Sequence, residues 1–142
     1  MVIDLFTALG SDSIEERVRA LYEVQSRGTA CLPELLEILD RADATMPARV
    51  WSLMAIGQLG PGIADRAHDG VVRCLSADSP TVRRAAIRVL GALRDVAAIT
   101  AIANLASDTM QDPSAWFDDD CTVGQTAALV LGELQALDNQ RT

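Results

Sequence analysis

The fold is decided by residues 78–105, which read DSPTVRRAAIRVLGALRDVAAITAIANL. Ser79 can cap a helix whose first residue is Pro80, a position at which the missing backbone N–H costs nothing. Apolar residues then recur at helical spacing in two sets, which a turn at Arg94 and Asp95 separates. The first set is Val82, Ala86, Val89, Leu90 and Leu93, and the second is Ala98, Ala101, Ile102 and Leu105. The stretch predicts two antiparallel helices that cannot bury their apolar faces alone.

The same pattern recurs elsewhere in the chain. A shift of 34 residues upstream places Gly57 on Gly91. A shift of 66 residues upstream places Arg17 on Arg83, and a shift of 41 residues downstream places Gly132 on Gly91. Self-similarity at such periods is typical of repeat proteins, in which stacked helix pairs bury one continuous core.

The repeats predict an all-α fold, a right-handed α-solenoid of about three antiparallel helix pairs in one domain. A chain of 142 residues, 49% of them hydrophobic, is long enough to bury such a shared core. The expected boundaries are a single domain at 1–142, full repeats at 12–40, 46–76 and 78–106, capping helices at 2–9 and 122–137, and an insertion loop at 107–121.

At these residues the chain resembles HEAT-repeat proteins. The segment 78–95, DSPTVRRAAIRVLGALRD, is most similar to the short HEAT-like repeats of the phycobilin-lyase type. The resemblance implies a superhelix whose second helices line a concave surface. For function it implies a scaffold or adaptor that binds another protein, with a subunit of a chromophore-lyase-like or other enzyme complex as the alternative.

Glycine and arginine recur at fixed places in the first helices. The glycines are Gly57, Gly91 and Gly132, and the arginines are Arg17, Arg49 and Arg83. A glycine inside a helix costs about 1 kcal/mol relative to alanine, so we expect the paired helix to pass close to each glycine. We expect each arginine to donate hydrogen bonds to a turn between repeats and so to lock neighbouring units.

The outward positions of the second helices predict a partner-binding strip on the concave surface. The strip comprises Glu34, Glu37, Ile38, Arg41, Arg73, Cys74, Thr100 and Asn104. Surface substitutions in the strip should weaken partner binding and leave the melting temperature nearly unchanged.

An acidic and aromatic loop interrupts the repeats before the last helix. It contains Trp116, Phe117, Asp118, Asp119 and Asp120. One interpretation is structural: the aromatic pair packs against the last helix and the carboxylates favour its N-terminus. The other is a second recognition surface for a basic partner, because residues 95–142 carry −7 of the net charge of −8. Both interpretations remain open at this stage.

Candidate catalytic residues are scarce. All 12 basic residues are arginine, which excludes a Schiff-base or phosphate-loop lysine. His68 is the only histidine, and we expect a structural role for it rather than one as general base or metal ligand. Cys74 is the one nucleophile worth testing. We therefore expect no enzyme activity, no cofactor and no metal ion.

Cysteine usage and charge bear on the surroundings of the protein. Cys31, Cys74 and Cys121 form no C-x-x-C pair, which favours a reducing, cytoplasmic compartment. No apolar run approaches membrane-spanning length, so no membrane contact is expected. The net charge of −8 disfavours nucleic acid as a partner. The expected partner is another protein, and the oligomeric state is left open.

Overall fold

The computed structural model describes residues 4–111 and 121–141, and helices form most of this part. Residues 2 and 3 of the expected first helix lie outside the described residues, as do residues 112–120 of the insertion loop. Within the described ranges there is no strand, and the one β contact is an isolated bridge between Gln111 and Thr122.

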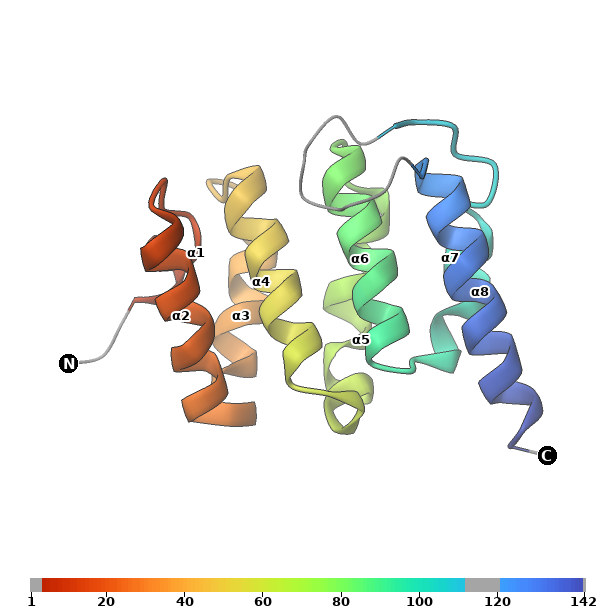
Figure 1. Cartoon of the computed structure of the whole chain (residues 1–142), viewed down its shortest axis with the longest axis horizontal. Helices are drawn as coiled ribbons and strands as arrows, with labels where there is room; N and C mark the ends of the chain where they lie inside the picture. The colour runs from red at the N-terminus through yellow and green to blue at the C-terminus, as the bar shows by residue number, and fades with distance from the viewer. Residues whose placement is uncertain (1–3, 112–120, 142) are drawn as a thin grey trace.

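The helices stack in two layers (Figure 1). The first layer consists of α2 (Ile14–Arg27), α4 (Met46–Gln58), α6 (Pro80–Ala92) and α8 (Val123–Asn139). The second layer consists of α1 (Leu5–Leu9), α3 (Leu32–Asp40), α5 (Ala64–Arg73) and α7 (Ile99–Ala103). Short 3-10 turns lead into or out of the second-layer helices, at Gly28–Cys31, Pro61–Ile63, Cys74–Ser76 and Val96–Ala98. The prediction of an all-α solenoid of antiparallel helix pairs is confirmed.

Each first-layer helix begins at a serine or threonine cap. The hydroxyls of Ser13, Thr45 and Ser79 each accept a hydrogen bond from the backbone N–H three residues on. Thr122 caps α8 in the same way, and the side chain of Gln125 accepts a hydrogen bond from the Thr122 N–H in return. Such caps satisfy N–H groups that lack a partner inside the helix, so local sequence fixes where these helices start.

The core lies between the two layers and is continuous along the stack. Leu35 of α3, Leu53 of α4, Leu90 of α6 and Leu134 of α8 are each 0% exposed. Burying a side chain of this size contributes roughly 1.5–3 kcal/mol. Each repeat therefore shares this core with its neighbours and is stabilised by them.

The recurrent glycines face a different neighbour from the one predicted. A Cβ at Gly57 would lie 3.7 Å from a Val89 methyl group of α6, and a Cβ at Gly91 would lie 3.1 Å from a Val130 methyl group of α8. Both glycines therefore meet the next first-layer helix and not the paired second helix, so that part of the prediction is wrong. A Cβ at Gly132 would meet nothing within 4 Å among the described atoms.

The recurrent arginines bind the turns between repeats, as predicted. Arg17 donates from Nη1 to the Ser11 carbonyl at 2.7 Å, and Arg49 donates from Nη2 to the Arg41 carbonyl at 2.8 Å. Arg83 donates from Nη1 to the carbonyl of residue 77 at 2.8 Å and to that of residue 78 at 2.9 Å. Each guanidinium thus donates to a carbonyl of the turn that precedes its own helix, so the predicted hydrogen bonds are confirmed.

Candidate interaction site

The predicted strip is partly exposed along the second layer. The exposed members are Glu37 on α3, Arg73 at the end of α5, Thr100 on α7 and Asn104 just after α7. These four side chains lie on successive second helices, as the repeat register predicts.

Two members of the strip are buried, so their predicted exposure is wrong. Ile38 is 2% exposed and Cys74 is 7% exposed, and both belong to the hydrophobic core. Ile38 lies on the side of α3 that packs into the core, and Cys74 lies in the 3-10 turn after α5, where the helical spacing is lost. Ile38 is therefore not available to a partner at the surface.

Glu34 and Arg41 are half-buried and engaged within the chain. Arg27 donates to a Glu34 carboxylate oxygen at 3.2 Å. Arg41 donates both Nε and Nη2 to Asp43 at 2.9 Å, and its guanidinium lies 3.6 Å from the ring centroid of Phe6 on α1. The hydrogen bonds from Arg41 lower the pKa of the Asp43 carboxyl. Both strip residues therefore help to hold the first repeat together.

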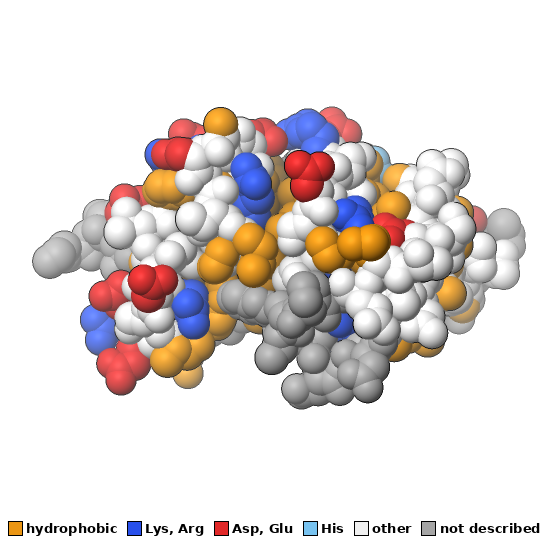
Figure 2. Space-filling model, turned by 90° about the horizontal axis from the view of Figure 1, so that it is seen from above, with side chains coloured by type: hydrophobic (Ala, Val, Ile, Leu, Met, Phe, Trp, Pro, Cys, Tyr) orange, Lys and Arg blue, Asp and Glu red, His pale blue; other side chains and the backbone are white. Residues whose placement is uncertain are grey.

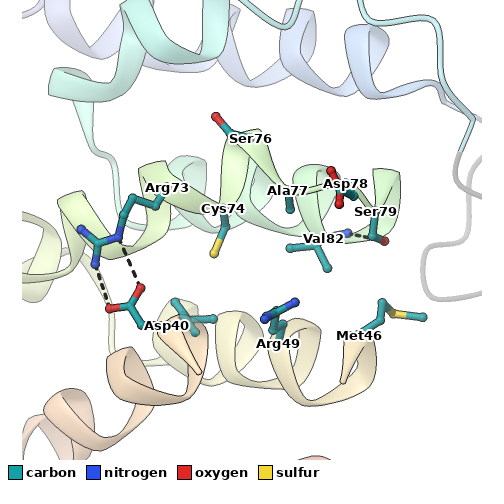
Figure 3. A pocket seen from close by; sticks show the side chains of 11 residues that line it. Asp40, Met46, Arg49, Arg73, Cys74, Ser76, Ala77, Asp78, Ser79 and Val82 are labelled. Carbon is teal, nitrogen blue, oxygen red and sulfur yellow. Dashed lines mark hydrogen bonds and ion pairs between the residues drawn. The ribbon is translucent and has the colours of Figure 1, made fainter. Parts of the chain in front are cut away.

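A cavity of about 400 Å³ lies beside the exposed part of the strip (Figure 3). The end of α3, the start of α4 and the segment from Arg73 to Val82 line it. At one end Arg73 donates from Nη2 and Nε to the two carboxylate oxygens of Asp40, at 3.0 and 3.3 Å. The Arg73 and Asp40 side chains are 59% and 54% exposed. Their pair connects α5 to α3 across the surface.

The cavity combines an apolar wall with charged groups. Leu39, Met46 and Val82 supply apolar surface, and Arg49 lies across from Cys74 (Figure 3). This arrangement can accept a partner's apolar side chain together with a polar or charged group at the rim.

The thiol of Cys74 turns into the space between the helices. Burial raises its pKa to about 11, with the positive charge of Arg49 acting in the opposite direction. The S–H group lies 3.6 Å from the Gly70 carbonyl, which accepts from it. At neutral pH the group is a neutral thiol, and the nucleophilic form needed for chemistry is the thiolate. The earlier suggestion of Cys74 as an outward-facing nucleophile is therefore wrong.

Sequence reasoning missed Asp40 as a member of this site, although a signal for it exists. Asp40 lies in the first repeat and Arg73 in the second, 33 residues apart, close to the 32-residue offset between those two copies that the shifts of 66 and 34 residues give. Opposite charges one repeat apart fall beside each other on successive second helices. A search for oppositely charged pairs at the repeat spacing would have found the pair.

His68 forms a polar contact that no repeat spacing predicts. Its Nδ1 lies 2.6 Å from a carboxylate oxygen of Asp95, which is 5% exposed in the turn between α6 and α7. A buried carboxylate requires such a partner. His68 therefore connects α5 to the turn that follows α6, consistent with the structural role predicted for it.

The edge of the stack at which the first-layer helices begin carries charges of both signs. Figure 2 views this edge, where acidic and arginine side chains are interspersed with apolar patches. Trp116, Phe117, Asp118, Asp119 and Asp120 lie outside the described residues, so both interpretations of their loop stay open.

Two further findings concern residues 4–111 and 121–141. In these ranges no three His, Cys, Asp or Glu side chains gather in a group that could hold a metal ion. The helices within the same ranges are too short or too polar for any of them to cross a membrane.

Comparison with known families agrees with the repeat architecture. The family model of HEAT repeats matches residues 32–113, more than half of the 142-residue chain. This match is to HEAT repeats in general and does not confirm the phycobilin-lyase type. A search of curated proteins found no match.

Proposed function

Since the chain belongs to the HEAT-repeat family, we propose that it is a non-catalytic module that binds another protein through the exposed part of its second layer. HEAT repeats generally mediate protein–protein interaction, and extended surfaces of stacked repeats serve as binding faces. The partner would lie across α3, α5 and α7 and contact Glu37, Arg73, Thr100 and Asn104.

The observation that carries this proposal is the exposed Arg73–Asp40 pair beside the cavity. An exposed ion pair contributes only about 0–1 kcal/mol to folding, so stability gives little reason for it. At an interface, the same bidentate geometry presents a fixed guanidinium, and arginine is enriched among residues that dominate binding energy. The adjacent apolar wall offers a place for a partner side chain to be buried.

The proposal is tested by identifying a stoichiometric partner in a pull-down with mass spectrometry and measuring its affinity. The double variant Glu37→Ala and Arg73→Ala should weaken binding about tenfold or more, through loss of contacts that only the complex makes. Its melting temperature should stay close to that of the wild type, because both side chains are exposed.

A matched control is available in the first layer. Glu15 and Arg19 of α2 are also exposed and are the same residue types. The double variant Glu15→Ala and Arg19→Ala should bind the partner as the wild type does. Normal binding by the Glu37/Arg73 variant, or equal losses in both double variants, would show that the second-layer site is misplaced.

The acidic C-terminal part adds a finer proposal about the partner. Because residues 95–142 hold −7 of the net charge, a partner with a basic surface should be steered toward them. Replacing Asp118, Asp119 and Asp120 with Asn should lower the association rate and flatten its salt dependence. Replacing Trp116 with Ala should instead raise the dissociation rate if that ring contacts the partner. An unchanged association rate in the Asn variant would contradict the proposal that the partner has a basic surface.

A further inference from the structure

The turn that ends α6 holds an arginine in a backbone conformation that favours glycine. Arg94 has a φ of 55°, and the N–H of Asp95 donates to the Leu90 carbonyl at 3.1 Å across this turn. The equivalent positions at shifts of 34 and 66 residues are Gly60 and Gly28, with φ values of 85° and 63°. The left-handed region costs free energy for any residue that carries a Cβ. An arginine in place of the expected glycine therefore points to a role for its side chain.

A pocket of about 390 Å³ lies where α6 and α8 end, and the Arg94 side chain lines it (Figure 1). The other lining residues are Val96 from the same turn, and Leu137, Gln140 and Arg141 from the end of α8. Val96 and Leu137 supply apolar surface, and Gln140 supplies an amide. The volume falls in the range of small-molecule sites, roughly 300–1,000 Å³, so the pocket has room for more than a bare ion.

The charge of this pocket is opposite to that of the chain around it. Residues 94–142 contain eight acids and two basic residues, and those two, Arg94 and Arg141, both line the pocket. None of the described residues that line it is acidic. Asp95, next to Arg94 in the sequence, instead contacts His68 at 2.6 Å. The fold thus gathers the two positive charges of an acidic region at one place, which complements an anion.

The helix ends do not account for this arrangement. A cation is favoured at a helix C-terminus, because the last carbonyls carry partial negative charge. The equivalent turn after α4 nevertheless has Gly60 at this place, and the last turn of α4 contains no basic residue. Within residues 4–111 and 121–141, neither the Arg94 nor the Arg141 guanidinium forms an ion pair or a hydrogen bond. Their donors are therefore available to a ligand.

We propose that this pocket binds a phosphate monoester with an apolar substituent, and that the phosphate group lies between Arg94 and Arg141. A phosphate monoester carries about −1.5 to −2 charges at neutral pH and three acceptor oxygens, which matches two guanidinium groups. Each planar guanidinium donates parallel hydrogen bonds to such oxygens. The apolar substituent packs against Val96 and Leu137. This pocket shares no residue with the second-layer site and stands or falls independently of it.

The first test compares three ligands by calorimetric titration of the full chain. The probe is phenyl phosphate. Phenylacetate keeps the ring but carries a single negative charge, and inorganic phosphate keeps the phosphate without the ring. Phenyl phosphate should bind about tenfold more tightly than either comparison ligand. No binding of phenyl phosphate would overturn the proposal, and so would a comparison ligand that binds as tightly as the probe.

The second test removes the arginines one at a time. Arg94→Gly restores the residue of the equivalent turns, so it should keep or raise the melting temperature while lowering the affinity for phenyl phosphate about tenfold or more. Arg141→Gln should lower the affinity similarly. Arg66→Gln, at an exposed arginine of α5, removes the same charge elsewhere and should bind as the wild type does. Unchanged affinity in Arg94→Gly, or an equal loss in Arg66→Gln, would overturn the proposal.

The phosphate monoester reaches the pocket either as a free small molecule or as a phosphorylated side chain of a partner. A short phosphotyrosine peptide, titrated beside phenyl phosphate, distinguishes these two sources. An affinity about tenfold higher for the peptide would identify the partner's side chain, because flanking residues then add contacts. An equal or lower affinity would identify the free molecule. Peptide binding that persists without the phosphate group would overturn the proposal.

Discussion

The turns before α6 and before α8 both have carbonyls that need hydrogen-bond donors, and very different residues supply those donors. At the first, Arg83 spans the turn and donates to the carbonyls of residues 77 and 78. At the second, the equivalent residue is Gly124, whose own N–H donates to the Asp108 carbonyl at 2.8 Å. A long side chain reaches the turn in one case, and the backbone itself contacts the turn in the other.

This difference shows why Gly124 cannot carry the arginine of the other repeats. A Cβ there would lie 2.6 Å from the carbonyl oxygen of Ala106 and 2.7 Å from that of Asp108. The two junctions are also connected, since Arg83 donates from Nε to a carboxylate oxygen of Asp108 at 3.0 Å. An inter-repeat turn needs donors for its carbonyls, and either a guanidinium or a closely approaching helix N-terminus can supply them.

The largest effect is expected at the glycine junction. Gly124→Ala should destabilise the protein by about 3 kcal/mol, because the new methyl group clashes with two backbone oxygens that cannot move independently. Urea unfolding followed by circular dichroism measures this loss. Gly132→Ala is the control at a helix position without such a clash. A loss below about 1 kcal/mol would show that the turn relaxes freely.

The arginine junction before α6 should give the next largest effect. Arg83→Met keeps much of the apolar stem and removes the donors to two carbonyls and to Asp108. Since the Arg83 side chain is 12% exposed, we expect a loss of about 2 kcal/mol. The same unfolding experiment measures it. Stability equal to the wild type would contradict the locking role assigned to this arginine.

A smaller loss is expected at the junction before α4. Arg49 donates to one carbonyl, that of Arg41, at 2.8 Å. Arg49→Met should therefore cost about 1 kcal/mol, roughly half the loss at Arg83. Urea unfolding of the Arg49 and Arg83 variants under the same conditions measures both losses of stability. A larger loss at Arg49 than at Arg83 would show that the number of turn contacts does not determine the strength of a junction.

The smallest change should have the opposite sign. Gly132→Ala should stabilise the protein by about 0.5–1 kcal/mol, because alanine favours the helix and the described structure leaves open space around this position. Gly57→Ala should behave similarly, whereas the 3.1 Å approach of Val130 should make Gly91→Ala less favourable than either. Thermal unfolding of the three variants ranks them. Equal shifts of the melting temperature in all three variants would show that helix propensity alone determines the change in stability at these sites.

Much of the fold follows from local chemistry that the sequence displays. The Ser79 cap, Pro80 and the apolar spacing after it predict α6 closely, and the helix runs from Pro80 to Ala92. The recurrence of Arg17, Arg49 and Arg83 at one register predicted their contacts with the turns. Periodicity works here because each repeat contacts only its neighbours, so one register describes every junction.

The candidate site was less predictable. Helical spacing placed Ile38 and Cys74 on the outer face, yet both are buried. The helical spacing ends at the 3-10 turn Cys74–Ser76, and Ile38 lies on the side of α3 that packs into the core. Asp40 and Arg73 are brought together by the stacking of α3 against α5, a contact that is visible in the sequence only as opposite charges about one repeat apart. The contact of His68 with Asp95 spans 27 residues and follows no repeat period.

The sequence by itself therefore determined the helices, their caps, their pairing into repeats and the arginine contacts with the turns. These depend on short-range spacing and on a register that repeats along the chain. Only the tertiary structure decided that the glycines face the next first-layer helix, that Gly124 contacts a turn directly, and that Arg94 and Arg141 line one pocket. Those features depend on the distance and rotation between neighbouring helices, which the packed side chains set jointly and no single repeat encodes.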